Sequence, residues 1–277
     1  MKKLLFLLSI VLVGCNNTTT DWDNYQLKGN VEFVKLSFYD ADSKFGEIVK
    51  GDLDYLGITT IEFNESGYIT STSEYYEDGD LYSKDIYSYK NDKNDKLDNV
   101  IKYDSKGDLS YKTIYNWDAD NLQSVIHYNE DGEETFKSIS EYVNGNLKSY
   151  SYYRNGELVS KEIITKNNGD YVLESVSYDK DGKEIGTIIN EWKNKQIVKR
   201  RFISDEENSY SIFHNEKGLA IKSENCYVTQ NAIYTSEEGI YYYEYEFDDN
   251  DNWIKCIVYK GKIKEPYKLI EREIRYR

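Results

Sequence analysis

The stretch Tyr103-Asp104-Ser105-Lys106-Gly107-Asp108-Leu109 decides the fold, because it is the clearest copy of a unit that recurs along the chain. In this unit an aromatic residue ends a strand, polar residues make a turn, and an aliphatic residue starts the next strand. The glycine lies four residues after the aromatic, and glycine adopts the left-handed backbone of a tight turn without steric cost. The unit is therefore the signature of a β-hairpin.

Copies of this unit occur over most of the chain. The predicted turn glycines are Gly67, Gly79, Gly107, Gly132, Gly156 and Gly182. In the last copy, Phe247–Trp253, Asp251 takes the place of the glycine, and aspartate also tolerates a positive φ. Between the turns, aromatic residues alternate with other residues at the period of a strand, as in the segment 241–247.

These turns predict an all-β fold. Successive aromatic anchors lie about ten to fourteen residues apart, which gives a long sequential antiparallel meander of repeated hairpins with roughly sixteen to eighteen strands. Because strand twist accumulates across a sheet, we expect the meander to be curled or partly wrapped. Residues 25–277 are predicted to form a single repetitive β-sheet domain in which neighbouring repeats make most contacts.

The N-terminus has the three zones of a secretion signal. Lys2 and Lys3 are followed by the apolar run 4–13 and then by Gly14 and Cys15. About ten apolar residues are too few for a membrane-spanning helix, which needs about 20. Residues 1–14 are therefore predicted to be a cleaved signal peptide.

Leu12-Val13-Gly14-Cys15 resembles the lipobox of bacterial lipoproteins. The resemblance implies cleavage between Gly14 and Cys15, lipid attachment at Cys15, and a membrane as partner through that lipid. The alternative is an ordinary secretory signal with an incidental cysteine. Residues 15–24 are predicted to be a polar, lipidated tether. By resemblance to Gram-negative sorting rules, Asn16 favours an outer-membrane location in the cell envelope, with the domain facing either the periplasm or the outside.

Composition excludes some partners. The chain has 35 basic and 50 acidic residues and a formal net charge of −15, which argues against nucleic acid and against electrostatic attraction to anionic lipids. The charge indicates a solvated surface, with a cationic ligand as the alternative. The 29 tyrosines favour sheets whose faces are only partly covered.

No catalytic, metal or cofactor site emerges from the residues. His127 and His214 are the only histidines; without a GxSxG motif, both are predicted to be surface residues near turns. The segment 248–252 has oxygen ligands at alternate positions but lacks the glycine and glutamate of an EF-hand, which favours an Asx-rich turn. Carboxylate pairs of the glycosidase kind cannot be selected among 50 acids.

The two remaining cysteines and the aromatic residues each leave two alternatives. Cys226 and Cys256 are a candidate disulfide in an oxidising compartment, or two buried free thiols. The tyrosines and tryptophans are a stacking platform for sugars, or ordinary cross-strand packing.

Two repeat families share these motifs. Tyr103-Asp104-x-x-Gly107-x-Leu109 and Tyr178-Asp179-x-x-Gly182 resemble the YD repeats of the Rhs family, and the segment 152–158 resembles the variant MORN repeat. The ends of the domain also look like those of uncharacterised repeat lipoproteins of Gram-negative bacteria. The resemblance implies an Rhs-like β-sheet shell and supplies no catalytic residue, while the chain is too short for a complete Rhs cocoon.

These observations favour a non-enzymatic function. The leading hypothesis is a lipid-anchored cell-envelope repeat protein that binds a protein or glycan. The first alternative is an immunity or toxin-neutralising lipoprotein, suggested by the MORN-like unit and the acidic surface. The second alternative is an envelope hydrolase, which the scarcity of histidine disfavours.

Overall fold

The computed structural model describes residues 20–90, 96–168, 171–193, 196–204, 210–228, 233–234 and 239–277. In chain order the elements are α1 (Asp21–Asn24), β1 (Val31–Lys44), β2 (Glu47–Phe63), β3 (Ile69–Tyr75), β4 (Leu81–Tyr89), β5 (Leu97–Asp104), β6 (Leu109–Asp118), β7 (Asn121–Asn129), β8 (Glu134–Val143), β9 (Asn146–Arg154), β10 (Glu157–Asn168), β11 (Tyr171–Asp179), β12 (Glu184–Lys193), β13 (Gln196–Ile203), β14 (Tyr210–His214), β15 (Ala220–Glu224), β16 (Tyr227–Val228), β17 (Ile233–Tyr234), β18 (Ile240–Phe247), β19 (Trp253–Lys260) and β20 (Glu265–Tyr276).

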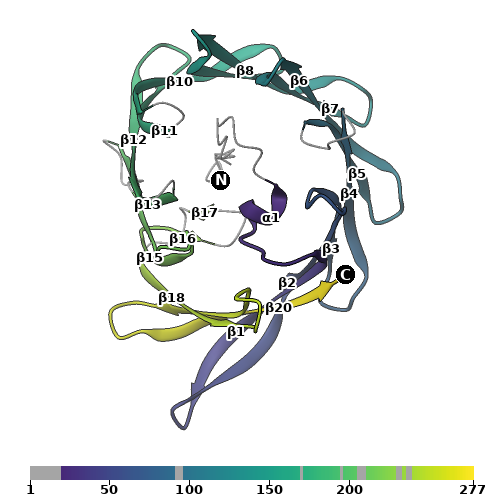
Figure 1. Cartoon of the computed structure of the whole chain (residues 1–277), viewed down its shortest axis with the longest axis vertical. Helices are drawn as coiled ribbons and strands as arrows, with labels where there is room; N and C mark the ends of the chain where they lie inside the picture. The colour runs from purple at the N-terminus through teal and green to yellow at the C-terminus, as the bar shows by residue number, and fades with distance from the viewer. Residues whose placement is uncertain are drawn as a thin grey trace.

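The strands form a closed, up-and-down antiparallel barrel. Within the described ranges, 18 strands belong to one sheet in which each strand pairs with the next one along the chain, and β16 and β17 form a separate pair. The ring closes where β20 pairs with β1, from Val31 opposite Tyr276 to Asp40 opposite Lys268. Figure 1 shows the resulting ring, with α1 drawn inside it.

The prediction of an all-β fold is confirmed, but the prediction of an open meander, curled or partly wrapped, is wrong because the sheet is closed. Closure depends on pairing between the two ends of the domain, and no local sequence pattern reports such a pairing. Closure also removes the two unpaired sheet edges that an open meander would expose.

The turn glycines lie in left-handed conformations. Gly67, Gly79, Gly107, Gly132, Gly156 and Gly182 have φ values of 84°, 91°, 85°, 80°, 80° and 80°. In the turn at Gly107, the Asp104 carboxylate accepts hydrogen bonds from the backbone N–H groups of Lys106 and Asp108 at 2.8 and 3.0 Å. The aspartate of the repeat therefore holds its own turn together, and Asp251 has a φ of 63° in the corresponding position.

The barrel has two mouths. The N-terminal mouth is the end at which β1 starts and β20 ends, and it includes the turns 64–68, 119–120, 144–145, 215–219 and 248–252. The far mouth includes the turns 76–80, 105–108, 130–133, 155–156, 180–183 and 261–264 and the tip of the β1–β2 hairpin at Phe45 and Gly46. This hairpin extends beyond the ring in Figure 1.

A repeated side-chain hydrogen bond ties neighbouring strands together at the N-terminal mouth. In each case an aromatic residue near the end of one strand donates to the carbonyl oxygen of a residue at the start of the preceding strand in the sheet. The pairs are Tyr89 and Ile69 (2.8 Å), Trp117 and Leu97 (2.8 Å), Tyr142 and Leu122 (3.3 Å), Trp192 and Val172 (2.8 Å), and Tyr245 and Ala220 (2.9 Å). Some of the many tyrosines and tryptophans therefore serve to join neighbouring strands of the barrel.

The N-terminal segment, residues 20–30, lies inside the barrel at this mouth and contacts the turns 64–68 and 248–252. The last four residues of the predicted tether form α1, where Thr20 and Asp23 make a capping box. The predicted signal peptide, Gly14 and Cys15 lie outside the described residues. No helix in the described ranges is long and apolar enough to cross a membrane.

The main hydrophobic core lies where this segment packs against the wall. Its most buried members are Val31, Val34, Leu36, Ile61, Tyr241 and Val258, from β1, β2, β18 and β19, and Trp22 and Tyr25 pack against them. The rest of the inner wall is lined mainly by half-buried side chains.

Candidate functional site on the inner wall

The pairing register assigns each side chain to the inner or the outer face, since directly opposed residues share a face. Leu36, Phe38, Tyr243, Tyr245 and Ile270 line a cavity together with residues of the α1 segment, so their face is the inner one. Following opposed pairs around the ring places rows of aromatic and small polar side chains inside.

The outer face mixes charged and apolar side chains, and the opposed pairs Ile86–Ile101 and Ile114–Ile126 lie on it. Lysines, glutamates and isoleucines alternate with the inner residues along the strands. The outer-face ion pairs include Lys161–Glu141 (3.2 Å), Arg201–Glu191 (3.4 Å), Lys255–Glu246 (2.8 Å) and Lys50–Glu271 (2.6 Å). A barrel face in contact with lipid carries an apolar band about 25 Å tall instead. The chemistry of this face suits contact with water.

Five residues on β6 to β9 form a continuous aromatic strip on the inner wall. We define the strip as Tyr111, His127, Phe136, Tyr152 and Tyr150, and the ring centroids of successive members are 6.4, 5.3, 6.3 and 6.4 Å apart. All five side chains are half-buried. Edge-to-face and tilted contacts at these distances stabilise the strip, and its half-buried side chains keep part of their surface accessible.

The tyrosine hydroxyls of this wall are available for hydrogen bonding. Those of Tyr111, Tyr115, Tyr150 and Tyr152 form no hydrogen bond with any residue that the structure describes. Burial raises the pKa of each, to about 12 for Tyr115, so all four remain protonated donors at neutral pH. Glu162 lies directly opposite Tyr150 and adds a carboxylate acceptor.

Both histidines lie near turns, as predicted, but on the inner wall of the barrel and half-buried instead of on its outer surface. His127 lies two residues before the end of β7, and its Nδ1 is 2.9 Å from Thr113 Oγ1. His214 ends β14, and burial, followed by the charge of Arg200, lowers its pKa to about 4. Burial also lowers the pKa of His127, so both rings are neutral at pH 7. No local pattern reports this position, because closure of the barrel decides which face of β7 and β14 lies inside the ring.

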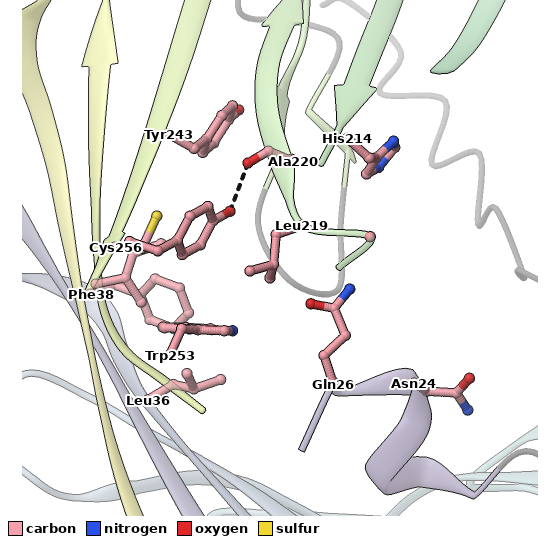
Figure 2. A pocket seen from close by; sticks show the side chains of 13 residues that line it. Asn24, Gln26, Leu36, Phe38, His214, Leu219, Ala220, Tyr243, Trp253 and Cys256 are labelled. Carbon is pink, nitrogen blue, oxygen red and sulfur yellow. Dashed lines mark hydrogen bonds between the residues drawn. The ribbon is translucent and has the colours of Figure 1, made fainter. Parts of the chain in front are cut away.

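A small cavity lies between the α1 segment and the wall (Figure 2). Its volume is about 140 Å³. Phe38, Trp253 and Leu36 form an apolar side, while Gln26 and His214 face it from the other side. Gln26 Oε1 and His214 Nδ1 are buried without a hydrogen-bond partner among the described residues. Sequence reasoning missed Gln26, whose φ of 53° is unusual for a residue other than glycine.

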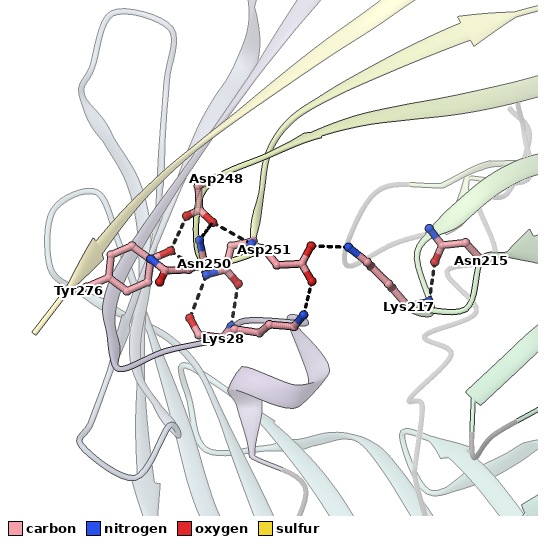
Figure 3. A network of polar contacts seen from close by, with 8 residues as sticks. Lys28, Asn215, Lys217, Asp248, Asn250, Asp251 and Tyr276 are labelled. Atoms are coloured by element: carbon pink, nitrogen blue, oxygen red, sulfur yellow. Dashed lines mark hydrogen bonds and ion pairs between the residues drawn. The ribbon is translucent and has the colours of Figure 1, made fainter.

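A polar network fastens the N-terminal segment to two turns of the mouth (Figure 3). Asn252 holds the backbone of Lys28, and Asp251 forms ion pairs with both Lys28 and Lys217. These contacts lower the pKa of Asp251, and the hydrogen bond from Lys217 has the largest effect. The Asp248 carboxylate accepts from the backbone N–H groups of Asn250 and Asn252, so the segment is an Asx-rich turn. The described ranges contain no group of three or more His, Cys, Asp or Glu residues able to hold a metal.

The candidate disulfide between Cys226 and Cys256 is not formed. Both residues are buried free thiols, and burial raises the pKa of each to about 12. Strand β18 lies between β15, which Cys226 follows, and β19, which contains Cys256. Two strand spacings amount to about 9.5 Å, beyond the usual Cα separation in a disulfide.

Two inner carboxylates are diagonal neighbours on β3 and β4. Glu74 is opposite Ser83, and Thr72 is opposite Asp85. Glu74 binds Lys102 at 3.4 Å and Ser83 at 3.0 Å, while Asp85 Oδ1 is shielded from solvent and burial raises the Asp85 pKa. Glu74 is thus engaged in wall contacts, whereas Asp85 Oδ1 has no hydrogen-bond partner among the described residues.

Comparisons with known proteins give distant likenesses only. The chain matches no protein-family model and no curated protein. Among solved structures it is similar to a porin-like protein from Bacteroides uniformis, with 11% identity, a TM-score of 0.43, and coverage of 90% of this chain and 99% of that one. A porin-like protein from Bacteroides vulgatus is 9% identical, with a TM-score of 0.30 and coverage of 89% of this chain and 98% of that one. The Tc holotoxin pore of Photorhabdus luminescens is 10% identical, with a TM-score of 0.29 and coverage of 80% of this chain and 14% of that one.

Proposed function

We propose that this chain is a lipid-anchored envelope protein whose barrel binds a glycan chain along the aromatic strip of its inner wall. The observation that carries the proposal is the strip itself, in which half-buried rings lie beside unpaired tyrosine hydroxyls and the Glu162 carboxylate. Sugar rings present apolar faces that stack on aromatic rings and hydroxyl groups that bind such donors and acceptors.

The interior is wide enough for an extended chain. With 18 strands at ordinary spacing and tilt, opposite backbone walls are about 35 Å apart, which leaves roughly 20 Å between inner side chains. A folded protein domain exceeds that width, whereas an oligosaccharide does not. This comparison favours a glycan over a protein as the ligand of the inner wall.

In this proposal the lipid anchor is attached to Cys15. The sequence 12–15 and the polar segment after it support a lipid at this residue, and two or three acyl chains would hold the protein on a membrane. The net charge of −15 gives the chain no electrostatic attraction to an anionic bilayer. Replacing Cys15 by Ser is expected to abolish incorporation of labelled fatty acid and to release the protein from membranes, and labelling that persists would refute this part.

The glycan proposal is tested with a form that begins near residue 20. Binding to an array of envelope oligosaccharides identifies the ligand, and titration calorimetry then compares Tyr152→Ala with Tyr153→Ala. These neighbouring tyrosines occupy opposite faces of β9, because Tyr152 is opposite Ser138 and Tyr153 is opposite Lys137. Tyr152→Ala is expected to weaken binding about tenfold, or about 1.4 kcal/mol, and Tyr153→Ala to leave it unchanged. Equal effects of the two substitutions would contradict an inner-wall site.

A further inference from the structure

We propose that the N-terminal mouth of the barrel faces the membrane, and that the far mouth and the tip of the β1–β2 hairpin point into the aqueous compartment. This inference rests on the lipid anchor at Cys15 and adds the surface that the barrel turns toward the bilayer.

Asp21 and Trp22, directly after residue 20, are fixed at the N-terminal mouth. Trp22 N donates to Gly67 O at 3.1 Å in the turn 64–68, and Asp21 accepts from Ile69 N at 2.8 Å at the start of β3. The hydroxyl oxygen of Tyr89, the last residue of β4, lies 3.3 Å from the same Asp21 carboxylate. The start of the described chain is therefore bound to three points of one mouth.

The second step is that the segment is held at its other end too. Figure 3 shows Lys28 bound to Asp251 of the turn 248–252, and Asp251 bound in turn to Lys217 of the turn 215–219. Asn252 of the first turn also accepts a hydrogen bond from Lys28 N. Both turns belong to the same mouth. Because the segment is fastened at both ends, it cannot slide toward the far mouth without losing these contacts.

The third step is the length of chain between the anchor and this fixed point. Cys15 lies five residues before Thr20, and five residues reach at most about 17 Å. The barrel wall is about 20 Å high, for strands of eight or more residues at a usual tilt. The short connection therefore keeps the N-terminal mouth near the headgroups and holds the far mouth away from them.

The charge of the mouth indicates what holds it there. The mouth carries the exposed acids Glu65, Asp118, Asp120, Glu216 and Asp249, together with lysines that pair with Asp120, Glu216 and Asp251, namely Lys96, Lys193, Lys28 and Lys217. A mouth whose lysines pair with its own acids offers little attraction to anionic headgroups. We therefore expect the acyl chains alone to hold the mouth at the bilayer, and the orientation to be insensitive to salt.

The test uses the full lipidated chain in vesicles of phosphatidylcholine and anionic phosphatidylglycerol with a headgroup-labelled quencher lipid. A fluorophore is attached to Ser66→Cys in a turn of the N-terminal mouth or to Ser105→Cys in a turn of the far mouth; both serines are exposed. The unsubstituted protein, whose two thiols are buried, gives the labelling background. Quenching is expected to be several-fold stronger at position 66, in low and high salt.

Equal quenching at the two positions, or stronger quenching at 105, would overturn the orientation while leaving the anchor in place. Absence of lipid on Cys15, measured by mass spectrometry of the same preparation, would overturn the anchor and the orientation together. Glycan binding by the lipid-free form is independent of both results.

Discussion

Asn252 binds both backbone groups of Lys28, a residue 224 positions earlier in the chain. Asn252 Oδ1 accepts from Lys28 N at 2.7 Å, and Asn252 Nδ2 donates to Lys28 O at 2.9 Å and to Tyr276 Oη at 2.7 Å. The side chain is fully buried. One amide thus joins the N-terminal segment, the turn 248–252 and the last strand, where the barrel closes.

Replacing Asn252 by Ala is therefore expected to loosen the N-terminal segment. The substitution removes the hydrogen bonds to Lys28 N, Lys28 O and Tyr276 Oη, and each such bond contributes about 0.5–1.5 kcal/mol. We expect the free energy of unfolding to fall by about 2–4 kcal/mol and amide hydrogen exchange to accelerate in residues 20–30. Asp249→Ala, an exposed change in the same turn, is the control. Unchanged exchange in residues 20–30 would show that the network does not hold the segment.

The repeated bond between an aromatic side chain and a backbone carbonyl gives a second prediction. Tyr89→Phe keeps the ring but removes the hydroxyl that donates to Ile69 O at 2.8 Å and lies 3.3 Å from the Asp21 carboxylate, and we expect a loss of about 1–2 kcal/mol of stability from the two contacts together. Tyr153→Phe changes a half-buried outer-face tyrosine and should cost little. Chemical denaturation of the two variants measures the difference, and equal stabilities would argue that the mouth bonds are incidental.

The parts of the fold that sequence predicted are those set by short-range chemistry. The turn at Gly107 follows from four neighbouring residues, and the alternation in β18 follows from the strand period. Closure of the barrel follows from contacts between Phe33 and Arg275 and their neighbours at opposite ends of the chain, which no periodicity encodes. The inner position of His214 depends on that closure, so it was equally hidden.

At Gly107 the effect of backbone strain can be measured apart from any steric clash of a new side chain. A Cβ atom at Gly107 would meet nothing within 4 Å, yet its φ is 85°. Gly107→Val is expected to cost about 1–3 kcal/mol through strain alone, and Gly107→Asn clearly less, because asparagine enters this region more readily. Thermal unfolding of both variants tests the idea. Equal melting temperatures for valine and wild type would mean that the turn does not need a positive φ.

The pKa of His214 predicts an acid-sensitive term in stability. The folded pKa is about 4 and the ordinary value is 6.5, so between these values the unfolded state binds the proton and the folded state does not. The contribution of His214 is therefore complete above about pH 6.5 and is lost as the pH falls toward 4, by at most about 3 kcal/mol. Comparing His214→Gln with wild type by denaturation at pH 7 and pH 4.5 isolates this term. Parallel pH profiles would contradict a buried neutral ring.

The charged outer face predicts how the barrel behaves without lipid or detergent. Its ion pairs Lys161–Glu141, Arg201–Glu191 and Lys255–Glu246 cover β8 to β10, β12 to β13 and β18 to β19, where a lipid-facing wall would need an apolar band. A form that begins near residue 20 should therefore run as a single, monodisperse species in buffer by size-exclusion chromatography with light scattering. Adding detergent should change neither its mass, apart from bound micelles, nor its circular dichroism. Aggregation that detergent reverses would mean that the outer face of the barrel contacts lipid. The proposal of a lipid-anchored barrel surrounded by water would then fail, because a barrel that spans the membrane needs no separate lipid anchor to stay there.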